Sequence, residues 1–280
     1  AVPVFLLNLM AGAYQIALVP AWLAARRTDQ GQADRIFQYS FLRLLVSLSI
    51  AAIVMAAAAP IYLPLVAPGL APETFRLAAD MLWVMVLFVV AGGGSIAWAG
   101  VLNAQRRFAL PAIAPVLTPL VMAILLLVAR DELGISALAW GAVIGTALEA
   151  AIVGFALSRR GRPLLPKSTG ADLSSLRSRW VPMLLANLLL GGAGLIDQMM
   201  AASLGTGAAS AIGYGAKLVL AGLHVATLAL GVAVLPTYSE AAFGDRVGLR
   251  GRLRKHVAIV ALISIPAVGI AALIAEPVIR

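Results

Sequence analysis

The sequence predicts an all-α polytopic membrane protein with about eight transmembrane helices. Of its 280 residues, 62% are apolar and only 12% are charged, with a mean hydropathy of +0.98. Soluble domains carry roughly 25% charged residues. Apolar runs long enough to cross a bilayer recur along the whole chain, and basic residues gather in alternate loops between them. Composition, run length and loop charge therefore indicate the same fold class.

The spans follow from the apolar runs and from the charges, prolines and glycines that separate them. In the second span, Pro60, Pro64 and Pro68 should break up the outer end of the helix. In the third, Gly92–Gly94 mark a point where the helix can bend or a neighbour can approach closely. The eight spans lie near residues 3–24, 38–66, 79–102, 111–129, 136–157, 180–204, 209–236 and 255–275.

Loop charge predicts the orientation. The first, third, fifth and seventh loops hold 3, 2, 6 and 5 Lys or Arg residues, and the loops between them hold 1, 1 and 0. By the positive-inside rule the odd loops are cytoplasmic and both chain ends lie outside. The chain opens inside an apolar run without a signal-peptide pattern and stops directly after a span, so we expect a fragment of a longer protein.

The polar stretch 158–179 is the expected domain boundary, because it is the longest and is rich in Pro, Gly, Ser and Arg. It would act as a basic cytoplasmic linker. Residues 1–157 would then form five first-lobe helices, and residues 180–280 three helices of a truncated second lobe.

An acid and a base face each other across a short turn in the second part of the chain. Asp197 precedes this turn and Lys217 follows it, and both should lie roughly 11 to 12 Å below the same membrane surface. His224 is seven residues past Lys217 and so lies on the same helical face. The two interpretations are a structural ion pair that joins two helices and a polar cavity that handles a charged cargo.

Two further ionisable residues lie within predicted spans. Arg43 is close to the cytoplasmic end of the second span, where it could snorkel to the headgroups or contact a lumen. Glu149 continues a face of small residues formed by Gly141 and Gly145 and has no partner nearby in the sequence. It is a hydrogen-bonded core carboxyl, a proton or sodium site, or part of a lumen wall.

An internal repeat suggests two lobes. The segment Ala17–Arg26 is similar to Ala233–Ala242, and Ala58–Tyr62 is similar to Ala275–Ile279, at offsets of 216 and 217 residues. Both matched pairs have the same direction across the membrane. A duplication with six-helix periodicity would give two lobes related by a pseudo-twofold axis along the membrane normal.

With these features the chain resembles the MurJ/MviN type of lipid-linked oligosaccharide flippase, in the multidrug/oligosaccharidyl-lipid/polysaccharide exporter superfamily. The most specific similarities are Gly100–Leu117, Gly194–Leu218 and Leu230–Ala241. The resemblance implies about fourteen helices in two lobes, of which this chain would hold the second to the ninth.

The resemblance also concerns the cavity charges of the family. Lys217 stands where the family keeps an arginine in a Y-A-x-R-L pattern, which preserves the charge. Members that flip the peptidoglycan precursor have paired arginines and a glutamate in the second helix, where this chain has Leu6, Leu7 and Ala11. These departures bear on the substrate and leave the expected fold unchanged.

We therefore predict a transporter that flips an anionic lipid-linked oligosaccharide or a peptidoglycan precursor similar to lipid II by alternating access. Substrate contacts would come from Lys217, His224, Asp197 and Arg43, with Glu149 or Asp197 as an ion-coupling site. An ion-coupled drug or cation antiporter of the same superfamily and a non-transporting scaffold in envelope assembly are the alternatives. A membrane-embedded transferase is disfavoured, because the loops contain neither Asp-x-Asp nor His-x-x-x-Asp.

The same observations bound cofactors, partners and location. Without cysteine, the chain has no disulfide framework, thiol nucleophile or cysteine metal site, and we expect no metal and no cofactor, only coupling to sodium, protons or the membrane potential. The net charge of +9 lies largely in short loops and indicates topology instead of a nucleic-acid partner. Expected partners are the lipid-linked sugar, membrane lipids and envelope-biosynthesis proteins, in the bacterial cytoplasmic (inner) membrane.

The predicted orientation can be tested by cysteine labelling. Loops 25–37, 103–110, 158–179 and 239–254 should face the cytoplasm, and single cysteines can be introduced on a background that contains none. A Ser168→Cys variant in intact cells should resist an impermeant thiol reagent and react after permeabilisation. Labelling from outside would contradict the orientation.

Overall fold

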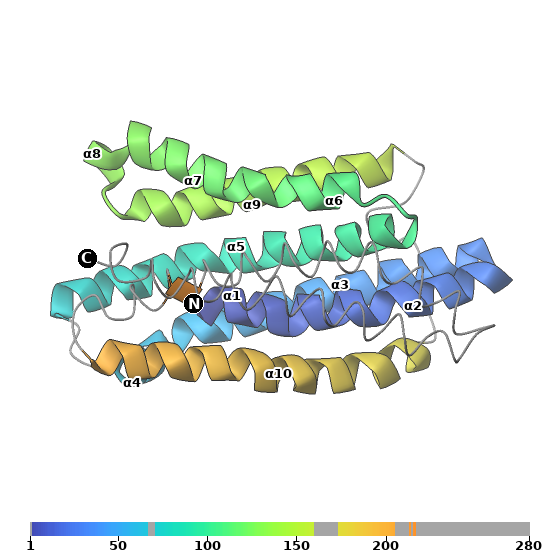
Figure 1. Ribbon diagram of the computed structural model, residues 1–280, viewed down its shortest axis with the longest axis horizontal. Coiled ribbons are helices and arrows are strands. Elements are labelled where there is room, and N and C mark those ends of the chain that lie inside the picture. The colour runs from blue at the N-terminus through green and yellow to red at the C-terminus, as the bar shows by residue number, and fades with distance from the viewer. Residues whose placement is uncertain (1, 67–70, 160–172, 205–212, 214, 217–280) are drawn as a thin grey trace, which may run out of the picture. The chain divides into compact units, whose positions relative to one another are not determined.

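The computed structural model is a bundle of helices (Figure 1). It describes residues 2–66, 71–159, 173–204, 213, 215 and 216. Ala1–Ser203 form one compact unit, and the fold described below is the fold of that unit. Its elements are α1 (Val2–Leu7), the π-helical turn η1 (Asn8–Gly12), α2 (Ala13–Thr28), α3 (Gln30–Ala57), α4 (Ala59–Val66), α5 (Pro72–Ala104), α6 (Ala109–Ile113), the 3₁₀ turn η2 (Ala114–Val116), α7 (Leu117–Val128), α8 (Arg130–Leu133), α9 (Ser136–Ser158) and α10 (Ser174–Ser203).

The first six predicted spans are confirmed. Within the described residues, six helical segments are long and apolar enough to cross a membrane. The seventh and eighth predicted spans, and the second copy of the internal repeat, lie outside the described residues. The segments are Val2–Arg27, Gln30–Ala57, Pro72–Ala104, Ala109–Val128, Ser136–Ser158 and Leu176–Ala201.

Several helices are longer than their apolar runs, because local capping signals set their ends. The Asp29 carboxylate caps α3 by accepting hydrogen bonds from the backbone N–H groups of Gly31 (2.9 Å) and Gln32 (3.1 Å). α3 therefore begins eight residues before the predicted span at residue 38. Pro72 occupies the first turn of α5, where its missing N–H costs nothing. As predicted, the outer end is broken: α3 ends at Ala57, and α4 follows it.

The C-terminal end of α5 carries an arginine in a conformation that normally favours glycine. Arg106 has a φ of 59°. Its N–H bonds to the carbonyl of Asn103 (2.9 Å), and the N–H of Arg107 bonds to the carbonyl of Leu102 (3.0 Å). This pair of hydrogen bonds is the Schellman motif, in which glycine is the usual residue at this position. An L residue in the left-handed region costs about 1 kcal/mol or more.

α5 is the central helix of the unit. It packs against α9 on one side and against α3, α2 and α1 on the other (Figure 1). The core between α2, α3 and α5 contains Trp22 and the aromatic pair Phe41 and Trp98, whose ring centroids are 5.4 Å apart. The Tyr14 hydroxyl donates to Ser40 Oγ (2.7 Å), because the Ser40 hydroxyl itself donates to the Ile36 carbonyl (2.6 Å). This buried polar contact joins α2 to α3.

Glycines bring the helices into close contact. A Cβ added at Gly145 would lie 2.6 Å from the Cα of Thr118, and one added at Gly141 would lie 2.7 Å from the Cα of Met122. The backbones of α7 and α9 therefore touch, and the predicted small-residue face is confirmed. In α5, a Cβ at Gly92 would lie 2.8 Å from Leu7 Cδ2. Since α5 is continuous across Gly92–Gly94, close approach of neighbouring side chains, instead of a break, accounts for Gly92 and Gly93.

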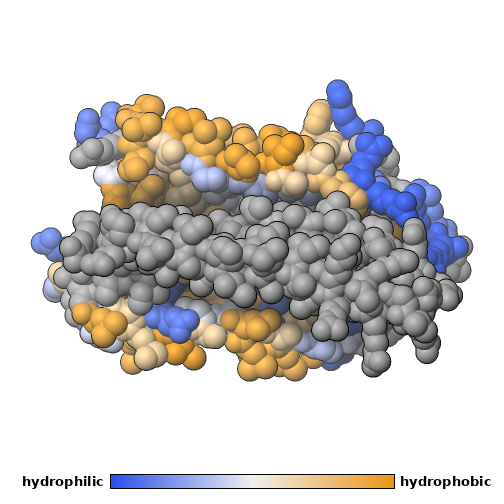
Figure 2. Space-filling model, in the orientation of Figure 1, coloured by the Kyte–Doolittle hydropathy of each residue, from blue (hydrophilic) through white to orange (hydrophobic). Residues whose placement is uncertain are grey.

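The surface of the unit suits a membrane. Figure 2 shows hydrophobic side chains along the flanks of the visible face, and hydrophilic ones mostly at the two ends. Leu127 (83% exposed) and Ile61 (75%) are examples of large apolar side chains on the surface. So extensive an apolar surface marks contact with lipid or with further protein.

Most of the described basic residues lie at one end of the bundle. The C-termini of α2, α5 and α9 and the N-termini of α3, α6 and α10 all lie at this end (Figure 1). We call it the basic end. Its arginines are Arg26, Arg27, Arg35, Arg106, Arg107, Arg159, Arg177 and Arg179.

Glycine substitutions separate packing from helix propensity. Gly145→Ala should destabilise the protein by about 1 to 3 kcal/mol, because the new methyl group overlaps the backbone of α7. Gly194→Ala is the matched control on α10: its Cβ would meet nothing within 4 Å. That change should stabilise the helix by roughly 0.5 to 1 kcal/mol. Thermal unfolding in detergent measures both, and equal shifts would contradict the close contact.

Candidate functional site

The Glu149 carboxylate lies at the junction of α5, α7 and α9. Ser95 on α5 donates to Glu149 Oε1 (2.7 Å), and Thr118 on α7 donates to Glu149 Oε2 (3.4 Å). The Thr118 and Thr146 hydroxyl oxygens are 3.2 Å apart. Ser95 and Thr146 are almost fully buried, whereas Glu149 is partly exposed. We call these four residues the Glu149 cluster.

The hydrogen bonds of the cluster have a direction. Each hydroxyl has a single proton. If Thr118 donates to Glu149, Thr146 must donate to Thr118, so the protons of all three hydroxyls point toward the carboxylate. This arrangement suits an ionised acid.

Helix packing explains why this carboxylate has partners. Gly145 lies one turn before Glu149, and its contact with α7 brings Thr118 within reach. Gly154 and Trp98 make a similar contact between α9 and α5: an added Cβ would lie 2.9 Å from the indole. The carboxylate is thus held by neutral donors. Of the described residues, no group of three or more His, Asp or Glu could hold a metal ion.

The predicted acid and base pair is only partly within the described residues. Asp197 lies in α10 and its side chain is exposed. Lys217 and His224 lie outside the described residues. The ion pair and the cationic face that they would form stay predictions.

Arg43 lies on an exposed face of α3. Its guanidinium stands 4.5 Å from the Tyr39 ring centroid, and its Nη2 donates to the Tyr39 hydroxyl (2.7 Å). Leu42 and Val46 are also exposed nearby on α3. Tyr39 is one turn closer to the basic end, so the guanidinium is directed there, as snorkelling requires. A role in substrate binding stays a prediction.

The positions that depart from the resembled family are buried in apolar surroundings. Leu7 (7% exposed) contacts the Gly92 position of α5, and Ala11 is fully buried. Leu6 packs against the same core. This part of the bundle is therefore built for apolar side chains.

The π-helical turn η1 separates Asn8 from Gln15. A π turn holds more residues per turn than an α-helix, so the seven-residue spacing no longer keeps both on one face. The Asn8 carbonyl accepts from Asn187 Nδ2 on α10 (3.1 Å), whereas Gln15 approaches Gly100 on α5. Both residues therefore take part in helix packing, against different neighbours.

Sequence reasoning missed the hydroxyl residues of the Glu149 cluster and the α10 side chains that donate to the π-helical turn. Thr146 is three residues before Glu149 on the same helix, so that local signal was available. Ser95 and Thr118 are 54 and 31 residues away in sequence, and only the packing brings them close. Trp180 and Asn187 on α10 donate to the carbonyls of Met10 (3.3 Å) and Asn8, which a regular α-helical pattern does not leave free.

Known proteins with similar sequences form one family. The family described as "Lipid II flippase MurJ" matches residues 1–280. A "Probable lipid II flippase MurJ" of Bdellovibrio bacteriovorus is 31% identical over 160 residues, which cover 56% of this chain and 30% of the relative. The "Lipid II flippase MurJ" of Burkholderia cenocepacia is 29% identical over 244 residues, or 82% of this chain and 47% of the relative.

The fold also resembles a solved transporter. The Vibrio cholerae MATE transporter VcmN in its bent form superposes with a TM-score of 0.65 at 18% identity. The match covers 93% of this chain and 60% of the transporter. At this identity the likeness concerns the fold alone. Like the match to VcmN, the matches to the curated relatives are partial: this chain spans about half of their length or less.

Removing a donor should test the Glu149 cluster. Ser95→Ala should lower the free energy of unfolding by about 1 kcal/mol, because the Glu149 carboxylate loses a hydrogen bond between two helices. Ser49→Ala is the matched control, since the Ser49 hydroxyl bonds only to the carbonyl of Leu45 in its own helix (2.8 Å). Thermal unfolding of both variants in detergent provides the comparison. Equal losses would show that Ser95 adds no stability through Glu149.

Proposed function

Because this chain belongs to the lipid II flippase MurJ family, we propose that it forms part of a transporter that moves lipid II, or a similar lipid-linked sugar precursor, across the bacterial cytoplasmic membrane. The observation that carries this proposal is the match of the family over residues 1–280. The six membrane-length helices and the likeness to a transporter fold support it.

The physical task is to move a polar headgroup through hydrocarbon. A phosphate-bearing sugar cannot enter an apolar phase unless polar groups replace its hydration. A flippase provides a cavity with cationic and hydrogen-bonding side chains that opens to one side of the membrane at a time. No covalent step is required, so we propose that the protein is a transporter without enzymatic chemistry.

We propose that Lys217 contacts the phosphate groups as a flexible point charge. His224 would add a hydrogen bond or a titratable charge on the same face. Asp197 would hold Lys217 while the cavity is empty. Arg43 is a weaker candidate for substrate contact, because its guanidinium is already bound to Tyr39.

Coupling would involve an acid inside the membrane. Glu149 accepts hydrogen bonds from the hydroxyls of Ser95 and Thr118. We propose it as a proton site, with Asp197 as the alternative ion site. Sodium or the membrane potential could supply the driving force in the same transporter.

A second candidate function is an ion-coupled drug or cation antiporter. The observation that favours it is the apolar burial of Leu7 and Ala11, where the resembled family places charges. An organic cation would need an apolar cavity and a carboxylate, and Glu149 offers the latter. The two functions differ in cargo: a lipid-linked anion in one and a soluble cation in the other.

Transport measurements separate the candidates. The full-length protein in proteoliposomes should move a fluorescent lipid-linked disaccharide diphosphate between leaflets and should leave a cationic dye in place. Efflux of the dye driven by a pH gradient, without lipid translocation, would favour the antiporter. Binding of the lipid-linked sugar with no translocation of either cargo would favour an envelope-assembly scaffold.

Substitution of Lys217 should distinguish cargo binding from a structural pair. Lys217→Arg should keep translocation, because the positive charge and its donors remain, whereas Lys217→Gln should reduce it by about tenfold or more. If Lys217 serves only to neutralise Asp197, the double variant Lys217→Gln with Asp197→Asn should recover, since no unpaired charge remains. Translocation is scored against the protein level in the membrane. Full recovery would contradict the cargo-binding role.

A further inference from the structure

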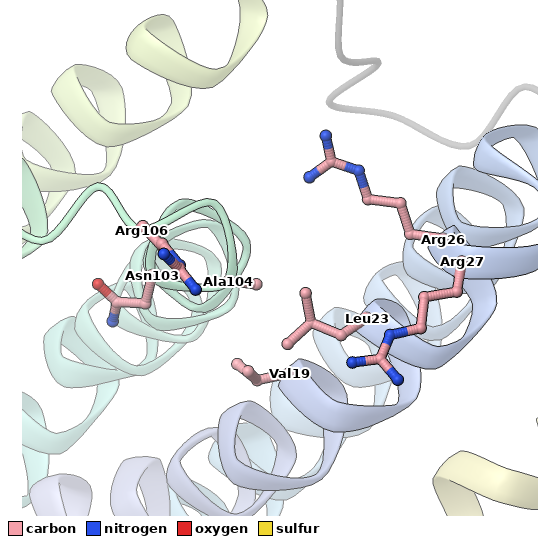
Figure 3. A pocket seen from close by; sticks show the side chains of 7 residues that line it. All are labelled: Val19, Leu23, Arg26, Arg27, Asn103, Ala104 and Arg106. Atoms are coloured by element: carbon pink, nitrogen blue, oxygen red, sulfur yellow. The ribbon is translucent and has the colours of Figure 1, made fainter. Parts of the chain in front are cut away.

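A basic pocket lies between the C-terminal ends of α2 and α5. Its volume is about 490 Å³. Figure 3 shows Arg26 and Arg27 reaching from the end of α2 and Arg106 from the end of α5, with Val19 and Leu23 between the two helices. Asn103 and Ala104 complete the lining. The pocket is thus apolar toward the middle of the bundle and cationic toward the basic end.

The pocket has a strong excess of positive charge. Of the residues that the structure describes, no carboxylate lines it. Among the described residues, Arg26, Arg27 and Arg106 make no ion pair. The nearby Asp29 already caps α3 and pairs with Arg35 (3.6 Å). Arg26 is held over the Trp22 ring at 5.1 Å, a contact that orients the guanidinium without neutralising it.

Helix dipoles do not cancel this charge. The C-terminal ends of two helices carry roughly half a negative charge each, whereas the three arginines carry a full positive charge each. The Schellman hydrogen bonds also satisfy the carbonyls of Leu102 and Asn103, and the N–H of Asp29 bonds to the carbonyl of Ala25 (2.9 Å). The net charge of the pocket is therefore positive, which favours binding of an anion.

Arg106 distinguishes this pocket from an ordinary group of basic residues. Its backbone is left-handed, although glycine would satisfy the same Schellman motif at lower energy. It also lines a second pocket of about 470 Å³, together with Arg107, Phe108 and residues of α6 and α9. Arg106 therefore lines two pockets at the basic end.

Membrane topology does not explain this arrangement. The positive-inside effect depends on the number of Lys and Arg residues in a loop, and it is indifferent to which position carries the charge. A charge at residue 105 or 108 would serve equally without a left-handed arginine. The strain at Arg106 therefore points to a use of its side chain at this position.

We propose that this pocket binds a phosphate anion, with Arg106 as the central ligand and Arg26, Arg27 and Asn103 as further donors. Guanidinium groups match phosphate oxygens with paired hydrogen bonds. The apolar wall of Val19 and Leu23 suits the acyl chain of a lipid whose headgroup carries the phosphate, and basic pockets between transmembrane helices bind such headgroups. The site is separate from the Glu149 cluster and does not depend on the proposed flipping activity.

The test measures binding to the purified full chain in detergent by microscale thermophoresis. The ligands are dihexanoyl phosphatidylglycerol, farnesyl diphosphate, inorganic phosphate and the zwitterionic dihexanoyl phosphatidylcholine. Arg106→Gly is the decisive variant, because it removes the guanidinium and relieves the left-handed backbone. Its melting temperature should not fall, so a loss of binding cannot be ascribed to unfolding.

Arg159→Gln is the matched control. It removes one positive charge from the same end of the bundle, and Arg159 lines neither pocket; its guanidinium stands over the Phe155 ring at 4.9 Å. We expect Arg106→Gly to weaken binding of at least one phosphate ligand by about tenfold or more. Arg159→Gln should change it by less than about twofold, and Arg106→Lys should lie between these values.

The ligand series identifies the source of the phosphate. Preference for phosphatidylglycerol indicates bulk anionic lipid, preference for farnesyl diphosphate indicates a lipid-linked diphosphate, and equal binding of inorganic phosphate indicates free phosphate. Equal losses in Arg106→Gly and Arg159→Gln would overturn the proposal in favour of diffuse surface charge. Binding of phosphatidylcholine as tight as that of phosphatidylglycerol, or binding of none of the four ligands, would also overturn it.

Discussion

Close contact between helix backbones is the constraint on which the described unit depends. In hydrocarbon, apolar side chains gain little by leaving lipid for protein, so helices associate through van der Waals packing and interhelical hydrogen bonds. The glycines of α9 provide the first, because Gly141 and Gly145 let α7 lie against the backbone of α9. The second follows from it: only at this separation do Thr118 and Thr146 come within 3.2 Å of each other. The close packing of α7 and α9 and the hydrogen bonds between them therefore depend on the same glycines.

The same constraint applies to several polar groups inside the bundle. Glu149 is surrounded by hydroxyl donors from two neighbouring helices, and the Tyr14 hydroxyl is satisfied by Ser40. The carbonyls at the π-helical turn find donors on α10 through Trp180 and Asn187. Where a charge has no partner in the interior, as with Arg43, it lies on an exposed face and is directed toward the basic end. A charge is tolerated within a span when a neighbour or the headgroup region can replace water.

The sequence predicts the helices better than their contacts. Apolar run length located the first six spans, and the proline pattern located the break after Ala57. Helix starts were missed where a polar turn belongs to the helix, as at Asp29 and Gln30, because hydropathy detects lipid-facing residues and not helix caps.

The Gly141 and Gly145 face was predicted and its partner α7 was not, since a small-residue pattern does not specify which helix packs against it. For the same reason Ser95 and Thr118 could not be assigned to Glu149. The predicted cavity residues Lys217 and His224 lie outside the described residues, and the lobe division at residues 158–179 stays a prediction.

Arg106 shows how a backbone conformation can distinguish two uses of the same charge. Arginines at the end of a membrane helix are ordinary, and sequence alone explains them by topology. A left-handed φ adds information that composition lacks, because it records a cost of about 1 kcal/mol that glycine would avoid at this position. Capping of the helix does not require that cost, since the two Schellman hydrogen bonds involve only backbone atoms. Charge count does not require it either, because neighbouring positions are free of the strain. What remains is the position of the side chain, which lines an apolar pocket from the α5 side while Arg26 and Arg27 line it from α2. The strain is therefore best explained by a ligand in this pocket that the Arg106 side chain contacts.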